Sequence, residues 1–226
     1  MENKSKSKIF SDSENSHIAA KIYDDMSINY KDISSGDHYK AKLWLESKLL
    51  KYIGQSPKVL DLGCATGTTG EILKKNSIQA KYLHGADVSP KMIELCEKDK
   101  NYDFLQVLNV AQDLNKISQN NFDVVVAVGI MEFIKDCDQV LSDLSNLTAS
   151  NCDLYITFEN SSSELIQEYN TKHGQFKKIA RSREDVLSHI SNSRFIVQTI
   201  ETGAGYFSPS LSKEIEYLYC HLVKKR

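Results

Sequence analysis

Several features of common protein classes are missing from the sequence, and each absence excludes a class. No stretch approaches the ~20 consecutive apolar residues of a membrane-spanning helix, and the polar N-terminus lacks the apolar segment of a signal peptide. Lysine and arginine total 28 against 30 acidic residues, so the net charge of −2 gives no general attraction to nucleic acid or anionic membranes. We therefore expect a cytoplasmic protein that binds neither nucleic acid nor a membrane.

The cysteines exclude two further classes. The chain has five of them, scattered along its length, and none forms a C-x-x-C pair. This number and spacing fit neither a disulfide framework nor a zinc site. We expect reduced thiols in a reducing compartment, and no bound metal.

The length of 226 residues fits one large α/β domain better than two independent domains. Residues 1–17 are polar and dotted with lysine, which is typical of a disordered leader. Residues 18–226 then form a single domain, with a helical lid over 18–54 and an α/β core over 58–226. Apolar periodicity predicts two helices in the lid, at about 18–30 and 39–53.

From residue 58 onward, short apolar runs alternate with helical stretches. The runs predict strands at 58–62, 82–87, 104–108, 122–128 and 153–158, and the stretches between and after them predict helices at about 68–75, 89–99, 136–147 and 183–191. This alternation is typical of a mostly parallel sheet covered on both faces. Two final strands, at 194–199 and 214–223, are joined by a loop rich in Gly and Ser, so the last strand should run antiparallel. The expected fold class is a three-layer α/β sandwich with seven strands.

The turn after the first strand is the most informative segment. A buried strand runs into Gly63, the small residues Cys64 and Ala65 follow, and a helix begins just after Gly67. Glycines let a ligand approach the backbone, and such a turn presents N–H groups at a helix N-terminus. Asp61 adds a carboxylate at the strand end, which can receive a ligand ammonium directly or through water.

A second carboxylate closes the second strand. Asp87 lies 20 residues beyond Gly67, where an acidic residue can accept both hydroxyls of an adenosine ribose. The Ser-Pro pair that follows suits the start of a helix, so Val88 and Met92 would offer apolar walls to an adenine. Together the two motifs predict a nucleoside-binding crevice at the carboxyl ends of parallel strands.

These motifs resemble those of the class I S-adenosylmethionine-dependent methyltransferases, which have a Rossmann-like fold. The resemblance covers residues 23–158 and includes the stretch 122–134. It implies that the protein binds S-adenosylmethionine, releases S-adenosylhomocysteine, and transfers the methyl group by in-line displacement. A small-molecule acceptor is the first expectation.

The resemblance also implies which residues contact each part of the cofactor. These are Gly63, Cys64, Ala65, Gly67, Val128 and Gly129 for the methionine moiety, Asp87 for the ribose, Val88, Met92, Asn109 and Val110 for the adenine, and Tyr30 for the carboxylate. Asn109 would accept the adenine amine through its amide oxygen. The alternative for Tyr30 is a packing residue on a helix face.

Two departures from the family pattern bear on the site. Ala65 replaces the usual middle glycine of the turn, which is tolerable if it keeps a negative φ. Phe133 stands where a histidine often follows the fourth strand, so one candidate base is absent and the substrate side is more apolar.

The catalytic residues stay unassigned. A base is needed only if the acceptor carries a proton, and the candidates are His38 in the lid and His173 after the fifth strand; the alternative is that both are solvated. We expect the acceptor between the lid and residues 159–181, with Tyr206 and Phe207 contributing from the terminal hairpin loop. The basic residues at 172–183 are expected on a solvated helix face; the alternative is that they receive an acidic acceptor.

Three alternatives remain. A nicotinamide dehydrogenase would need glycine at the positions of Ala65 and Thr68, so its G-x-G-x-x-G spacing is not met. The acceptor could instead be a peptide or protein side chain. The chain could also be a non-catalytic module that binds the cofactor.

Overall fold

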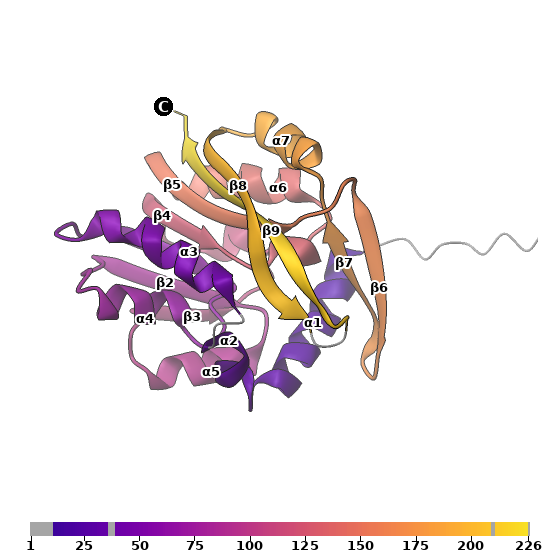
Figure 1. Cartoon of the computed structure of the whole chain (residues 1–226). Helices are drawn as coiled ribbons and strands as arrows, with labels where there is room; N and C mark the ends of the chain where they lie inside the picture. The colour runs from indigo at the N-terminus through magenta and orange to yellow at the C-terminus, as the bar shows by residue number, and fades with distance from the viewer. Residues whose placement is uncertain (1–10, 36–38, 209–210, 226) are drawn as a thin grey trace, which may run out of the picture.

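A seven-stranded sheet with the strand order β3-β2-β1-β4-β5-β9-β8 forms the centre of the molecule (Figure 1). The computed structural model describes residues 11–35, 39–208 and 211–225. The strands are β1 (Lys58–Leu62), β2 (Tyr82–Asp87), β3 (Phe104–Val107), β4 (Phe122–Ala127), β5 (Thr148–Glu159), β8 (Phe195–Ser208) and β9 (Lys213–Lys224). Strands β1 to β5 pair in parallel, and β9 runs antiparallel to both β5 and β8. The predicted fold class, including the antiparallel last strand, is confirmed.

Helices cover both faces of this sheet. One face carries α3 (Lys40–Leu49), α4 (Thr68–Lys75) and α5 (Pro90–Lys98), and the other carries α6 (Cys137–Leu147) and α7 (Arg183–Ser191). Short 3-10 turns occur at η1 (Leu50–Tyr52), η2 (Leu114–Lys116) and η3 (Met131–Phe133). No helix in the described ranges is long and apolar enough to cross a membrane.

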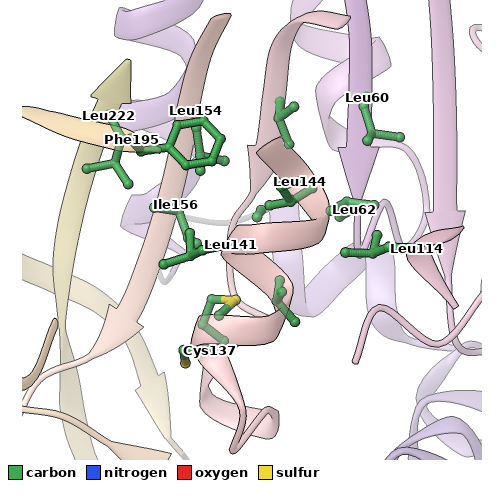
Figure 2. Packing of buried hydrophobic residues seen from close by; sticks show 14 of the residues in the cluster. Leu60, Leu62, Leu114, Cys137, Leu141, Leu144, Leu154, Ile156, Phe195 and Leu222 are labelled. Atoms are coloured by element: carbon green, nitrogen blue, oxygen red, sulfur yellow. The ribbon is translucent and has the colours of Figure 1, made fainter. Parts of the chain in front are cut away.

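Alternate residues along each strand supply the two halves of the core. On one face, Leu141 and Leu144 of α6 pack among side chains of β1 and β5, as Figure 2 shows. On the other face, Leu45 and Leu49 of α3 pack with Ile72 of α4 against β1, β4 and β5. Because both faces are buried, the strands are nearly continuous apolar runs, which is why their positions could be predicted.

The N-terminal part begins earlier than expected. Helix α1 (Asp12–Met26) starts at a Ser11 cap, so residues 12–17, expected in a leader, belong to the first helix. The reason is tertiary: the side-chain amide of Asn15 donates to the carbonyls of Phe133 (3.1 Å) and Lys177 (2.9 Å). The expected helix over 18–30 divides into α1 and α2 (Tyr30–Ser35). Residues 1–10 of the expected leader lie outside the described residues, and the single-domain division stays a prediction.

A two-stranded sheet was missed in the sequence. Residues 159–181, expected to be a polar segment, contain the hairpin of β6 (Leu165–Thr171) and β7 (Gly174–Ala180), which lies beside α1 (Figure 1). The basic residues there therefore sit mainly on a hairpin and not on a helix. Strand β8 also continues to Ser208, so Tyr206 and Phe207 belong to a strand and not to a loop.

Candidate cofactor and acceptor site

A cavity that is partly open to solvent lies at the carboxyl ends of β1, β2 and β4. In doubly wound sheets this is the edge at which ligands bind. Residues of α1, α2 and α3 line the cavity on one side, and the segments following β1 to β4 line it on the other. Figure 1 shows α1 and α2 close to α5, at this edge of the sheet.

The turn after β1 forms one wall of the cavity. Gly63 has φ +70°, and a Cβ there would lie 2.2 Å from Cγ2 of Ile130, so only glycine fits. Ala65 has φ +44°, so the negative φ under which an alanine would be tolerated without strain is not found. Its backbone N–H donates to Asp87 (3.0 Å), and this bond holds the strained turn in place. Cys64 also lines the cavity.

Gly67 does not line the cavity, contrary to its predicted role. It precedes α4 with φ +98°, and a Cβ there would lie 3.1 Å from Sγ of Cys96 and 3.3 Å from Tyr102. The glycine is therefore needed for the left-handed backbone and for close packing against α5. Its contribution to the site is the shape of the turn.

Asp87 is buried at the end of β2 and lines the cavity. Its carboxylate oxygens accept the N–H groups of Ala65 (3.0 Å) and Ser89 (2.9 Å). Burial raises the pKa of Asp87 to about 6, although these backbone bonds act in the opposite direction. A carboxylate has about four acceptor positions, so Asp87 retains capacity for a further donor from a ligand.

Asp61 is the second buried carboxylate on the cavity wall. Tyr102 donates to it across 2.6 Å. Burial raises the pKa of Asp61 to about 6, and the nearby Asp87 raises it further, against the hydrogen bonds from Tyr102 and Thr69. Two buried carboxylates at one cavity fit a ligand that brings hydroxyl donors and an ammonium, as an amino acid nucleoside does.

The residues predicted for an adenine are only partly at the cavity. Val88, Asn109 and Val110 line it, and so does Val128 beneath the turn. Met92 is fully buried and does not line it.

The amide of Asn109 already has partners. Its oxygen accepts the Ser16 hydroxyl (3.0 Å) and the Ala111 N–H (3.1 Å). An adenine amine would therefore compete with Ser16 for this oxygen. The sequence did not predict the hydrogen bond between Ser16 and Asn109, because Ser16 belongs to a segment expected to be a leader.

Three tyrosines form the aromatic part of the wall contributed by the N-terminal segments. Tyr30, predicted at the cofactor carboxylate, lies beside Tyr23, with ring centroids 6.0 Å apart. Tyr39, just before α3, completes the group. Burial raises the pKa of each phenol, so all three stay protonated as hydrogen-bond donors at neutral pH.

The two candidate bases have different outcomes. His38 lies outside the described residues. His173 lies in the turn between β6 and β7, 2.6 Å from Asp25 of α1, and does not line the cavity. It forms a surface pair that holds the hairpin against α1.

A buried charge cluster that the sequence did not reveal lies next to the cavity. It consists of Glu132 in η3, Glu159 at the end of β5, Lys178 of β7, Tyr206 of β8 and Tyr217 of β9. Glu159 accepts from the ammonium of Lys178 (2.6 Å) and the hydroxyl of Tyr206 (2.7 Å), and Tyr217 donates to Glu132 (3.1 Å). The second oxygen of Glu132 is buried and has no hydrogen-bond partner. Sequence reasoning missed the cluster because its five members come from five separate elements.

Arg181 attaches the hairpin to the loop after β4. Its side chain is fully buried, whereas we expected it on a solvated face. The guanidinium donates to the carbonyls of Met131 (3.0 Å) and Ile134 (2.6 Å). Since Ile134 and the neighbouring Phe133 line the cavity, Arg181 fixes part of the cavity wall from behind.

Comparisons with known proteins agree with this geometry. Residues 60–154, which contain the end of β1, the turn after it and β2 to β4, match the family described as methyltransferase domain. The chain is 28% identical over 183 residues to the carboxy-S-adenosyl-L-methionine synthase of Campylobacter concisus, covering 74% of each protein. It is 27% identical over 130 residues to the ribosomal protein L11 methyltransferase of Thermotoga neapolitana, covering 56% of this chain and 46% of that protein. The chain thus spans about half the length of that relative.

Solved structures share the whole architecture. The 1,6-didemethyltoxoflavin-N1-methyltransferase of Burkholderia thailandensis, with bound 1,6-didemethyltoxoflavin and S-adenosylhomocysteine, superposes with a TM-score of 0.71. The match covers 97% of this chain and 93% of that one at 14% identity, so it shows a common fold. The common fold includes the N-terminal helices as well as the sheet.

Proposed function

Because the chain belongs to the class I S-adenosylmethionine-dependent methyltransferases, we propose that its cavity binds S-adenosylmethionine and that the protein methylates a small-molecule acceptor. The observation that carries this proposal is the pair of buried carboxylates, Asp61 and Asp87, on either side of the turn at Gly63 and Ala65. Burial raises both pKa values to about 6 against the donors that each carboxylate already has, so further donors would stabilise the charged forms. A ligand with an ammonium and two ribose hydroxyls supplies them.

Each part of the wall has a place in this proposal. Asp87 binds the ribose, Asp61 receives the ammonium of the methionine moiety, and Gly63 lets the backbone approach it. Val88 and Val110 border the adenine, and Tyr30 reaches the carboxylate from the lid side. These assignments are supported by the lining of the cavity, because all six residues line one cavity.

The bound cofactor supplies a methyl group activated by its sulfonium. The protein's contribution is to hold the acceptor in line at near-attack distance, which can be worth up to roughly 7–11 kcal/mol in favourable systems. The tyrosines of α1 and α2 and the apolar Phe133 exclude bulk water from this position.

A small acceptor is favoured by the enclosure of the site. The hairpin β6–β7 packs against α1, and Lys178 lies 5.0 Å from the ring centroids of Phe133 and Tyr206. Through Phe133, which lines the cavity, these contacts support the wall on the side where an acceptor would lie. A wall supported in this way fits a small acceptor better than a folded protein. The Burkholderia neighbour, whose structure contains bound 1,6-didemethyltoxoflavin, has the same fold.

The cofactor assignment is tested by calorimetry with S-adenosylmethionine and S-adenosylhomocysteine. Both should bind, and Asp87→Ala should weaken both by about tenfold or more, because a carboxylate that accepts two hydroxyls makes charge-assisted bonds. Asp143→Ala, at a half-buried position of α6 remote from the cavity lining, serves as the matched control and should bind like wild type. Binding of a nicotinamide dinucleotide in place of both ligands would contradict the proposal.

The acceptor class is tested by release of S-adenosylhomocysteine. Wild-type protein is incubated with S-adenosylmethionine and either a dialysable cell extract or a library of peptides. Turnover with the dialysable fraction, lost in Asp87→Ala, is the expected result. Turnover with peptides alone would assign the acceptor to polypeptides, and cofactor binding without turnover in either pool would point to a non-catalytic module.

A further inference from the structure

The buried cluster around Glu132 lies directly behind the cavity wall. Glu132 follows the lining residues Gly129 and Ile130 and precedes the lining residue Phe133. A Cβ on Gly129 would lie 2.9 Å from the Tyr39 hydroxyl and 3.5 Å from the Tyr217 hydroxyl. Both hydroxyls therefore lie close to the bare backbone of Gly129; Tyr39 lines the cavity, and Tyr217 donates to Glu132.

The charges in this cluster do not balance when every group has its ordinary ionisation. Glu132 and Glu159 bring two negative charges, and Lys178 brings one positive charge, which it shares with Glu159 across 2.6 Å. Glu132 is left with one hydrogen bond from Tyr217 and one buried oxygen without a partner. A buried carboxylate in this situation favours a proton.

We propose that Glu132 takes up the proton that the acceptor loses on methylation, relayed through the hydroxyls of Tyr39 and Tyr217. This inference rests on the proposed methyl transfer. In the balanced step, the acceptor forms a bond to the methyl carbon, the cofactor's sulfur keeps the electron pair of the broken bond, and the acceptor's proton ends on Glu132. No other co-reactant is required.

The electrostatics of the neighbouring groups support this role. Burial raises the pKa of Glu132 to about 7; Lys178 opposes the increase and Glu159 adds to it. Burial acts to lower the pKa of Lys178, but the two glutamates outweigh it and raise it to about 12, so the lysine stays charged. A group with a pKa near neutrality exchanges protons readily in either direction.

Every element packed around Glu132 contributes a titratable group. Besides Lys178 and Glu159, these are the phenols Tyr23 of α1, Tyr30 of α2, Tyr39 before α3, Tyr206 of β8 and Tyr217 of β9. Each phenol has a pKa raised by burial, so it stays neutral and serves as a relay or a donor. Glu132 is therefore the member of the cluster whose charge changes near pH 7.

Glu132 should also respond to the charge of the bound cofactor. S-adenosylmethionine carries one more positive charge than S-adenosylhomocysteine, and a positive charge nearby favours the carboxylate. Binding of the first should therefore expel the proton from Glu132 and leave it ready to accept one. After methyl transfer the positive charge is gone, and the proton stays on Glu132 until the product leaves.

The test measures protons released on binding, by titration calorimetry near pH 7 in buffers of different ionisation enthalpy. Wild type should release on the order of half a proton more with S-adenosylmethionine than with S-adenosylhomocysteine, because Glu132 is about half protonated there. Asp61 and Asp87 meet groups common to both ligands, so their contribution largely cancels in this difference. Glu132→Gln should reduce the difference to near zero, whereas Glu168→Gln, on the exposed side of the hairpin, should leave it unchanged.

A second variant keeps the test decisive if Glu132→Gln fails to fold. Tyr217→Phe keeps the ring and removes the bond that favours the carboxylate, so the pH at which the difference is largest should move upward. Equal proton release with both ligands in wild type, or an unaltered difference in Glu132→Gln, would overturn the inference. Failure of either ligand to bind would instead overturn the proposed function.

Discussion

The hydroxyl of Tyr102 donates a 2.6 Å hydrogen bond to Asp61 and accepts one of 3.2 Å from the N–H of Gly70. One phenol from the segment before β3 therefore joins the carboxylate at the end of β1 to the first turn of α4. Because Tyr102 occupies one oxygen of Asp61, the orientation of that carboxylate in the cavity is fixed before any ligand binds. Such preorganisation reduces the cost of ordering on binding.

The charge of Asp61 should stabilise the complex with the cofactor and destabilise the ligand-free protein. Its pKa in the folded protein is about 6, above the ordinary 3.8. The unfolded chain therefore loses the proton more readily, and the free energy of unfolding falls as the pH rises between these two pKa values. Asp61→Asn keeps an acceptor for Tyr102 and removes the charge, so it should raise the thermal midpoint at pH 8 while weakening cofactor binding.

Thermal scans of ligand-free protein at about pH 4 and pH 8 check this prediction. The expected gain at pH 8 is on the order of 1–2 kcal/mol, from a shift of roughly two pKa units discounted for relaxation, and it should vanish near pH 4. Tyr102→Phe is the matched control: it keeps the charge of Asp61, removes its donor, and should lower stability at pH 8. A lower thermal midpoint for Asp61→Asn than for wild type at pH 8 would show that the charged carboxylate does not destabilise the ligand-free fold.

Ala65→Gly should stabilise the protein. Ala65 has φ +44°, and a left-handed alanine costs roughly 1–2 kcal/mol, against about 0.4–1 kcal/mol for the extra freedom of glycine in the unfolded chain. The net gain should be ~0.5–1 kcal/mol in denaturant unfolding, with the slope unchanged. Gly63→Ala, two positions earlier, should be strongly destabilising because its Cβ would lie 2.2 Å from Ile130. A loss of stability in Ala65→Gly would mean that the methyl group makes compensating contacts.

The sequence was sufficient where one local pattern determines one element. The helices at 68–75 and 183–191 were predicted at their observed bounds, because apolar spacing and capping residues such as Ser182 act locally. The turn after β1 and Asp87 were found for the same reason.

The features that the sequence did not predict depend on contacts between distant segments. Asn15 orders a polar stretch through carbonyls more than a hundred residues away, and Glu132 meets Tyr217 only because β9 inserts beside β5. Periodicity contains no information on such pairs. The hairpin β6–β7 was missed because its residues are mostly half-buried or exposed, so its apolar alternation is weak.

Arg181 should be required for both stability and the cavity. Its guanidinium is fully buried and spans the carbonyls of Met131 and Ile134, and Phe158 lies 6.0 Å away below it. Arg181→Met keeps most of the volume but leaves those carbonyls without donors, so unfolding should become easier by about 2–4 kcal/mol.

Cofactor affinity should fall as well, because the released loop contains cavity residues. Thermal unfolding and calorimetry measure the two effects. Arg183→Met is the control, since Arg183 donates to Ile200 at the surface and should change neither by much. If Arg181→Met is less stable but binds the cofactor with wild-type affinity, the loop that Arg181 holds does not determine cofactor binding.

Substitutions of Tyr30 test whether the N-terminal helices close over the cofactor or only pack on the core. Its ring lies against Tyr23 and lines the cavity. If its hydroxyl reaches the cofactor carboxylate, Tyr30→Phe removes one hydrogen bond to a charged group, worth about 1.5–3 kcal/mol, and affinity should fall roughly ten- to hundredfold. If Tyr30 only packs, the phenylalanine variant should bind like wild type, while Tyr30→Ala should lower the thermal midpoint.

Amide exchange over residues 18–35 provides a second test, because the backbone amides of a lid become protected when S-adenosylmethionine is added. Unchanged exchange together with wild-type affinity of Tyr30→Phe would leave α1 and α2 as packing elements alone.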